Sequence, residues 1–571
     1  MWRRSWLVFV LGAVITSSCA APSSRGSPEP STTGTDASAA PSTPRPGSIL
    51  RMALGAQPES LAAKFTSGSS TAYHELSNIF NSFIALYDPS DSLRPMLVRQ
   101  IPTQDNGDWV VNADGTMLTT YRLRENARWH DGAPVTAEDF VFAYEIYIDP
   151  TLPITVRDPE NLMLAVDAVD QRTFQIRWKQ PYFRANGLSE QALVPMPRHL
   201  LEEKYRSNKA GFADLPEFTT AWVGSGPFKL EKWEPGVSIT AKANLDWFLG
   251  PPRIESLEIR FITDPNTILA NLLSGDSDYT GSPFVRDAQA TAARQQWADG
   301  TGYVGSWSIK IQRTDFQYRE VPNWQPSLTD LRVRQALMHG LDREGLSDLM
   351  TSGLGGRADT FVQRSDPFFP LVDQVITRYP YDPGRAAALL ADAGWQRSAS
   401  SGMLANSAGQ GFGLEIWGTQ NQEAAFVADN WKQIGVASSI YLKPSAGLSS
   451  EVRAAFPGID ISNSPSSPES FRFMSVDAPT PQNRFTGPNK GSFSDAEVDR
   501  LQQARLEAVD STQRGEVTAA LFQRVSQVVP TGVLYYVPEF FIARGRLRGP
   551  MASNVVNPAT CWNIYEWELT G

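Results

Sequence analysis

The stretch that most constrains the fold is YRLRENARWHDGAPVTAEDFVFAYEIYID, residues 121–149. Its first three residues alternate as a strand does, and the dipeptide Asp131-Gly132 is typical of a tight turn. Thr136 suits the N-cap of a helix, because the carboxylate of Asp139 at the third helical position can reach back to the cap amide. Pro150 ends that helix, since the residue before a proline is pushed out of the helical region. The stretch therefore predicts a strand, a turn and a helix.

The length and charge of the chain limit its architecture and its partners. At 571 residues the chain is too long for one hydrophobic core, so two or three domains are expected. The formal net charge is −10, and Lys and Arg never form a block of five or more. Both observations argue against nucleic acid and against an anionic membrane surface as the main partner.

The N-terminus has the parts of an export signal. Two arginines precede an apolar run at residues 6–15, and small residues follow it. We therefore expect a signal peptide at residues 1–18 and, because residues 19–47 are almost wholly Ser, Thr, Pro, Ala and Gly, a disordered linker there. Cys19 resembles the lipobox cysteine that exporting bacteria acylate, so it is expected to carry a lipid anchor. Ordinary signal cleavage after Ala21 is the alternative.

Four ordered segments carry a recognisable family pattern. In the first segment the matching residues are Arg124, Trp129, His130, Asp131, Gly132, Pro134, Thr136, Ala137 and Asp139. Further matches follow at residues 223–279, 330–346 and 381–395. Together they resemble the family 5 solute-binding proteins, the extracytoplasmic peptide receptors of ABC importers.

The resemblance implies an α/β chain with the two-lobed periplasmic-binding-protein fold, type II and cluster C, with an extra inserted domain. The implied boundaries are 48–94, 221–305 and 530–571 for lobe I, 95–220 for the inserted domain II, and 306–529 for lobe III. From the local pattern alone, residues 457–471 are expected to be a loop and residues 561–567 a strand.

The same resemblance implies a receptor that captures an oligopeptide between two closing lobes and delivers it to an ABC permease and its ATPase. Such a receptor works outside the cytoplasm, lipid-anchored to the bacterial membrane on its periplasmic side or outer face, as a monomer and without a cofactor. Peptide-binding relatives hold the ligand backbone by strand-like hydrogen bonds and the α-amine by an Asp.

This chain departs from that pattern at two places. Ser464 stands where the amine-binding Asp would be, and Asp460 could replace it only with a register shift. The dipeptide-binding type clamps a carboxylate with an Arg just after the strand expected to end at Trp417, but residues 418–422, which follow Trp417, include no Arg. Because a buried ammonium without a counter-charge costs several kcal/mol, a dipeptide with a free amine is a poor candidate ligand.

Six residues are our candidates for the ligand site: Thr66, Ser67, Gln312, Trp417, Gln420 and Ser464. An oligosaccharide is the alternative ligand, because 16 tryptophans could supply stacking platforms and neutral Gln, Asn and Ser suit hydroxyl groups.

A secreted hydrolase is the competing functional class. The chain contains no G-x-S-x-G motif, no H-E-x-x-H motif and no Cys-His arrangement, so no catalytic residue is expected. Only four histidines occur and none stands at a metal spacing, so no metal site is expected. We predict that His130 satisfies local hydrogen bonds. An adhesin or scaffold is the third class.

Overall fold

The computed structural model describes residues 44–65, 71–154, 157–190, 192–444, 448–468, 471–552 and 559–570, all within one unit that spans Pro41–Gly571. The predicted signal peptide and Cys19 lie outside these ranges, as does the predicted linker up to residue 43. Thr66 and Ser67 lie outside them as well. The first strand begins at Arg45, because Arg45 pairs with Ile254 and its amide donates to the carbonyl of Arg253.

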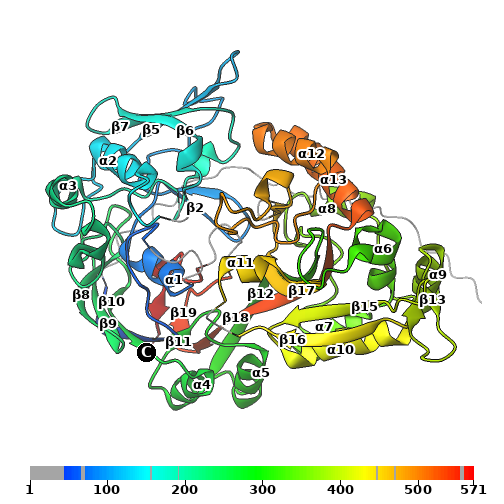
Figure 1. Cartoon of the computed structure of the whole chain (residues 1–571). Helices are drawn as coiled ribbons and strands as arrows, with labels where there is room; N and C mark the ends of the chain where they lie inside the picture. The colour runs from blue at the N-terminus through cyan, green and yellow to red at the C-terminus, as the bar shows by residue number, and fades with distance from the viewer. Residues whose placement is uncertain are drawn as a thin grey trace, which may run out of the picture. The chain divides into compact units, whose positions relative to one another are not determined.

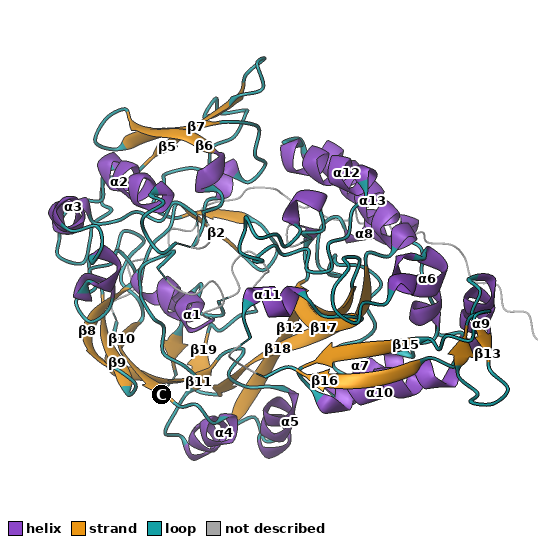
Figure 2. Cartoon of the chain, viewed as in Figure 1, coloured by secondary structure: helices purple, strands orange, loops and turns teal. Residues whose placement is uncertain are grey.

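A ten-stranded mixed sheet runs through this unit (Figures 1 and 2). Its strands follow one another in the order β16 (Ala437–Leu442), β15 (Gly413–Gly418), β17 (Ile459–Pro465), β12 (Gly302–Phe316), β18 (Thr531–Arg544), β11 (Tyr279–Thr280), β1 (Arg45–Leu54), β10 (Ile254–Phe261), β9 (Ser238–Ala243) and β8 (Phe228–Glu234). The sheet thus joins segments from both ends of the sequence.

The two long strands β12 and β18 connect the halves of this sheet. They pair antiparallel over almost their whole length, from Gly302 opposite Arg544 to Asp315 opposite Thr531. On one side of the pair lie β11, β1, β10, β9 and β8, and on the other lie β17, β15 and β16. The chain therefore passes between the two halves through β12 and returns through β18.

The first half of the sheet is covered by helices and carries a smaller sheet. Its helices are α1 (Thr71–Phe80), α4 (Pro265–Ser274) and α5 (Asp287–Gln296), and its further strands are β2 (Ala85–Tyr87), β3 (Leu93–Pro95), β19 (Leu547–Arg548) and β20 (Glu568–Leu569). The smaller antiparallel sheet has the order β4 (Trp109–Val111), β5 (Met117–Arg122), β7 (Thr173–Trp178) and β6 (Met163–Ala168), with helices α2 (Ala137–Ile148) and α3 (Arg198–Ser207) beside it.

The strand, turn and helix expected at residues 121–149 are confirmed as β5, a turn and α2. Thr136 is the N-cap of α2, and its backbone amide donates to Asp139 Oδ2 over 2.7 Å, as the capping box requires. His130 in the turn accepts from the amide of Gly224 at Nδ1 (3.2 Å) and lies 3.0 Å from the carbonyl of Gly226 at Nε2. The ring of His130 is thus hydrogen-bonded, as predicted, but its partners lie in a distant segment and not in its own turn.

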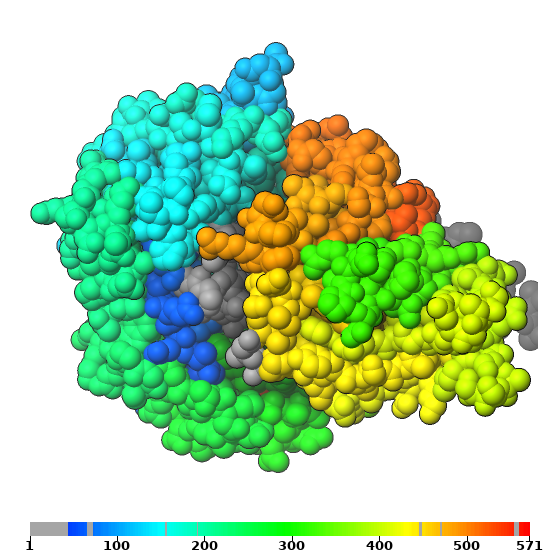
Figure 3. Space-filling model, in the orientation of Figure 1, coloured from blue at the N-terminus to red at the C-terminus, as the bar shows by residue number. Residues whose placement is uncertain are grey.

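The second half of the sheet contains a parallel β-α-β unit. In it α10 (Asn421–Gln433) connects β15 to β16 and packs on both. The surrounding helices are α6 (Leu331–His339), α7 (Arg343–Thr351), α8 (Phe369–Val375), α9 (Pro383–Asp392), α11 (Ser450–Ala454), α12 (Ala496–Glu507) and α13 (Ser511–Val528), and a small hairpin pairs β13 (Gln396–Arg397) with β14 (Leu404–Ala405). β16 is the edge strand, and most of its residues are exposed on the yellow surface of Figure 3.

Two expectations from the local pattern were wrong. Residues 457–471 contain strand β17, which pairs with β12 and, through its first two residues, with the end of its parallel neighbour β15. Residues 561–567 form turns and the short 3-10 segment Ile564–Glu566, because the amide of Ile564 donates to Cys561 and that of Trp567 to Ile564. In the first case, strands distant in the sequence provide the backbone hydrogen-bond partners. In the second case, the backbone groups bond within local turns and are not available to a sheet.

Candidate functional site: a cavity at the junction of the two sheet halves

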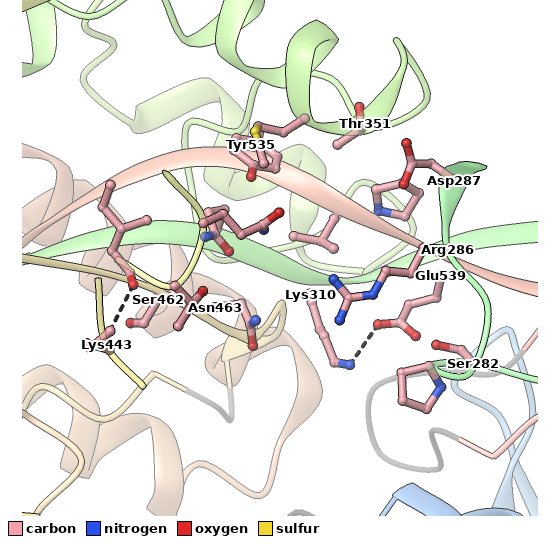
Figure 4. A pocket seen from close by; sticks show the side chains of 18 of the residues that line it. Ser282, Arg286, Asp287, Lys310, Thr351, Lys443, Ser462, Asn463, Tyr535 and Glu539 are labelled. Carbon is pink, nitrogen blue, oxygen red and sulfur yellow. Dashed lines mark hydrogen bonds and ion pairs between the residues drawn. The ribbon is translucent and has the colours of Figure 1, made fainter. Parts of the chain in front are cut away.

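A cavity of 490 Å³ lies where the second half of the sheet meets β12 and β18. Its walls come from the middle of these two strands, from β17, from the turns after β15 and β16, and from the start of α5 (Figure 4). The lining residues used below are Lys310, Gln312, Tyr535, Glu539, Asp460, Ile461, Ser462, Asn463, Gln420, Lys443, Leu448, Arg453, Lys490, Arg286 and Asp287. The cavity is large enough for several residues of an extended peptide or for a comparable small solute.

The structure brings two of the six candidate residues to this cavity, Gln312 and Gln420. Trp417 lies beside it but is buried, because its indole N–H donates to Glu415 Oε1 over 2.6 Å and its ring packs on Tyr441 at 4.6 Å between centroids. Trp417 is not among the lining residues, so it offers no stacking platform there.

Ser464 is turned to the other face of the sheet. It pairs with Ile311, which belongs to the hydrophobic core on that face, whereas Gln312 and its partner Asn463 are turned to the cavity. Among the described residues the hydroxyl of Ser464 has no hydrogen-bond partner. This position therefore does not supply a charge to the cavity.

A buried hydrogen-bond network orients Gln312 from below. The side-chain amide of Gln312 donates to Glu423 Oε2 over 2.9 Å, and the hydroxyl of Tyr535 donates to Glu423 Oε1 over 2.7 Å. Burial raises the pKa of Glu423 above its ordinary value, more than these two hydrogen bonds lower it. The three side chains thus form a closed polar floor under the cavity, supplied by β12, α10 and β18.

Asp460 is already engaged by two lysines. Lys443 Nζ forms an ion pair with Asp460 Oδ1, and Lys490 Nζ lies 3.8 Å from Oδ2. Burial still raises the pKa of Asp460, against the lowering effect of both lysines. Asp460 therefore cannot serve as a free counter-charge for a ligand ammonium unless it gives up Lys443.

A second ion pair lies at the other end of the cavity. Lys310 Nζ is 2.7 Å from Glu539 Oε1, and Figure 4 shows the pair beside Arg286. Asp287, which follows Arg286 at the start of α5, accepts a hydrogen bond from the hydroxyl of Ser352 over 3.1 Å. Charged side chains from both halves of the sheet thus face the same space.

The main chain of β17 presents a free edge to the cavity. The amide of Ser466 donates to Ile309 of β12 (2.7 Å), whereas the carbonyl of Ile461 points the other way and accepts from Lys443 (3.2 Å). Because backbone groups alternate along a strand, the N–H and C=O of Asn463 point away from β12, like those of Ile461. Pro465, which has no N–H to donate, falls on the same side.

The neighbouring strand β15 leaves this edge uncovered. Its pairing with β17 ends at Asp460, opposite Trp417. Among the described residues no strand pairs with Asn463 on the side away from β12. The cavity therefore contains a short stretch of strand edge with one N–H and one C=O directed outward.

Sequence reasoning missed most of the charged residues of the cavity. Lys443 directly follows β16, and its partner Asp460 lies in the segment interpreted as a loop. The apolar pair Ile459 and Ile461, two residues apart, is the sequence signal that could have indicated β17.

Among the described residues, neither a metal-ligand cluster nor an activated thiol is found. They include no group of three or more His, Cys, Asp or Glu side chains placed to hold a metal ion. The thiol of Cys561 is buried beside Glu75, and burial raises its pKa well above the ordinary value, which disfavours the nucleophilic thiolate. No helix in the described part of the chain is long and apolar enough to span a membrane.

The comparison with known families agrees with this arrangement. The model of the bacterial extracellular solute-binding proteins, family 5, middle region, matches residues 106–476, which is more than half of the chain. The chain belongs to this family. The resemblance noted from the sequence is thereby confirmed.

Relatives and solved structures of the family are similar to the chain at low sequence identity. The oligopeptide-binding protein AppA of Bacillus subtilis is 23% identical over 489 residues, which cover 80% of this chain and 84% of AppA. A putative ABC transporter peptide-binding protein of Brucella ovis is 28% identical over 289 residues, and this match spans only 49% of either chain.

Solved structures of the family share the fold. AppA from Bacillus subtilis in complex with a nonapeptide has a TM-score of 0.70 at 20% identity and covers 93% of this chain and 100% of its own. The Thermus thermophilus oligopeptide-binding protein complexed with a pentapeptide has a TM-score of 0.72 at 23% identity, covering 91% and 96%. NikZ from Campylobacter jejuni in complex with Ni(L-His) also has a TM-score of 0.72, at 21% identity, covering 91% and 99%. These likenesses confirm the predicted two-lobed α/β fold class.

Proposed function

We propose that this family 5 protein is the extracytoplasmic receptor of an ABC importer, capturing an oligopeptide between two closing lobes and delivering it to a membrane permease and its ATPase. In this proposal β12 and β18 are the two crossovers, and the lobes take the boundaries expected from the sequence. Lobe I takes 48–94, 221–305 and 530–571, the inserted domain 95–220, and lobe III 306–529.

The observation that carries the proposal is the uncovered edge of β17 at Asn463. An extended peptide can add to such an edge as one more strand, exchanging main-chain hydrogen bonds while its side chains occupy the cavity. Main-chain bonds are independent of ligand sequence, so this mode of binding suits a receptor that accepts many peptides. The nonapeptide and pentapeptide named with two structural neighbours support the same reading.

Closure would couple binding to delivery. A ligand that touches both halves of the sheet binds more tightly when the lobes approach, and it shifts the equilibrium toward the closed form. Residues from both halves line the cavity, with Arg286 contributed by the first half and Lys443 by the second. The permease would then recognise the closed form.

We also propose that the chain has no catalytic activity, acts as a monomer and is anchored through lipid on Cys19. The proposal of a receptor without catalysis rests on the family and on the lack of a nucleophile and base pair around the cavity among the described residues. The oligosaccharide alternative is weakened by the lining of the cavity, where the described aromatic side chains are Tyr535 and Phe540, with no tryptophan.

The test is to incubate the purified protein with pools of random peptides of five to nine residues and with a pool of oligosaccharides. A receptor should be stabilised against thermal unfolding by peptides and should release them intact, since ligands that bind only the folded state raise its stability. Cleaved products in the mass spectrum, or stabilisation by oligosaccharides alone, would refute the proposal.

A further inference from the structure

The cavity is basic, although the chain as a whole is acidic. Its lining contains five cationic side chains against three carboxylates, whereas the formal net charge of the chain is −10. The cationic side chains are Arg286, Lys310, Lys443, Arg453 and Lys490. Figure 4 shows Arg286 and Lys310 on one side of the cavity and Lys443 on the other.

Each of the three carboxylates already has a partner within the protein. Glu539 pairs with Lys310 at 2.7 Å, and Asp460 is shared by Lys443 and Lys490. The third carboxylate, that of Asp287, accepts the hydrogen bond of a serine hydroxyl, Ser352. Two of the three carboxylates are thus paired with lysines, whereas Asp287 has no cationic partner among the described residues.

The cations are not balanced in the same way. Lys443 and Lys490 have one carboxylate between them. Within the part of the chain that the structure describes, neither Arg286 nor Arg453 lies within ion-pair distance of an acid, and Arg453 Nε donates only to the carbonyl of Leu448 (3.2 Å). Both guanidinium groups are exposed at the cavity and retain donors for a ligand.

From this imbalance we propose that the cavity selects solutes that carry carboxylates, and specifically oligopeptides with acidic side chains. The inference rests on the proposed function, because the edge of β17 holds the peptide backbone and the cations choose among side chains. A guanidinium binds a carboxylate by two parallel hydrogen bonds, which gives geometric selectivity as well as charge complementarity. A lysine side chain in the ligand would meet five cations and only one carboxylate without a cationic partner, that of Asp287, so basic peptides are disfavoured.

The test uses three pools of random pentapeptides, acetylated and amidated, with two fixed positions that are both Glu, both Gln or both Lys. The pools are mixed in equal amounts with the purified protein, and the retained peptides are counted by mass spectrometry. We expect the Glu pool to be retained about tenfold over the Gln pool and the Lys pool least of all. The preference should shrink as salt rises, since exposed charges are screened.

A fourth pool, with Gln at the fixed positions and a free C-terminal carboxylate, separates the two sources of a carboxylate. Retention of this pool at the level of the Glu pool would assign the cations to the peptide terminus and overturn the inference about acidic side chains. Equal retention of the Glu, Gln and Lys pools would overturn it while leaving the proposed function standing. Failure of every pool to bind would refute the proposed function and this inference together.

Variants identify the cations responsible. The double variant Arg286→Gln with Arg453→Gln should lower the Glu-to-Gln retention ratio to near one. The matched control is Arg385→Gln with Lys432→Gln, which alters two exposed cations on α9 and α10 away from the cavity. An unchanged ratio in the cavity variant, or an equal fall in the control, would contradict the assignment.

Discussion

Replacing Asn463 by proline tests the strand edge that carries the proposed function. Proline removes the backbone N–H and places its ring where an added strand would approach. If the N–H of Asn463 points away from β12, no hydrogen bond of the sheet is lost, and the protein should fold. Proline is tolerated where the backbone N–H faces away from the paired strand, and not where that N–H donates to the paired strand.

The expected effect on binding follows from the single lost hydrogen bond. A main-chain hydrogen bond contributes about 0.5–1.5 kcal/mol net, which is about 2- to 13-fold in affinity. The ring also excludes the ligand strand from its closest approach, so we expect peptides to bind at least about tenfold more weakly. The thermal midpoint without ligand should stay close to that of the unmodified protein.

The assay compares peptide affinity by calorimetry and stability by thermal unfolding in three variants. Asn463→Ala controls for the side chain and should bind nearly as the parent does. Ser462→Pro removes an N–H directed toward β12 and leaves a partner carbonyl unsatisfied, which costs about 1–3 kcal/mol of stability. The reasoning is refuted if Asn463→Pro binds like Asn463→Ala, or if Ser462→Pro is the variant that keeps its stability.

Three further changes test the buried charges. Lys443→Met should lower the free energy of unfolding in urea by about 3 kcal/mol, since it leaves Asp460 buried with only the more distant Lys490. Adding Asp460→Asn should recover most of this loss, and no recovery would contradict the pairing. Burial lowers the pKa of His130 to about 4, so the parent should lose stability relative to His130→Gln as pH falls from about 6.5 toward 4, and parallel curves would argue against this. Burial raises the pKa of Glu423 above 4.5, so folding favours its protonated form. The parent should therefore lose stability relative to Glu423→Gln as pH rises above about 4.5. Thermal midpoints of the two proteins that stay parallel across pH would show that the carboxyl group is solvated.

Local signals in the sequence were sufficient for elements whose determinants lie within a few residues. The capping box of Thr136 and Asp139, the turn before it and the proline after the helix all act over short distances. His130 differs, because its ring is hydrogen-bonded by the backbone of Gly224 and Gly226, which lie far later in the chain.

The strand β17 was missed because its local signal is weak. Only Ile459 and Ile461 alternate as in a strand, and the serines and prolines that follow are typical of loops. It becomes a strand because β12, far earlier in the chain, pairs with it from Lys310 to Phe316. Strand propensity depends on such partners more than on the segment itself.

The sequence by itself determined the family, the two-lobed fold class and the strand, turn and helix at residues 121–149, because family motifs and capping residues are recognisable within short stretches. Only the tertiary structure decided which side chains share the cavity. A shift of one residue in the register of β17 would exchange Asn463 for Ser464 at the cavity, and register is set by pairing between distant strands. The charge of the cavity, and with it the preference for acidic ligands, is therefore a property of the folded chain.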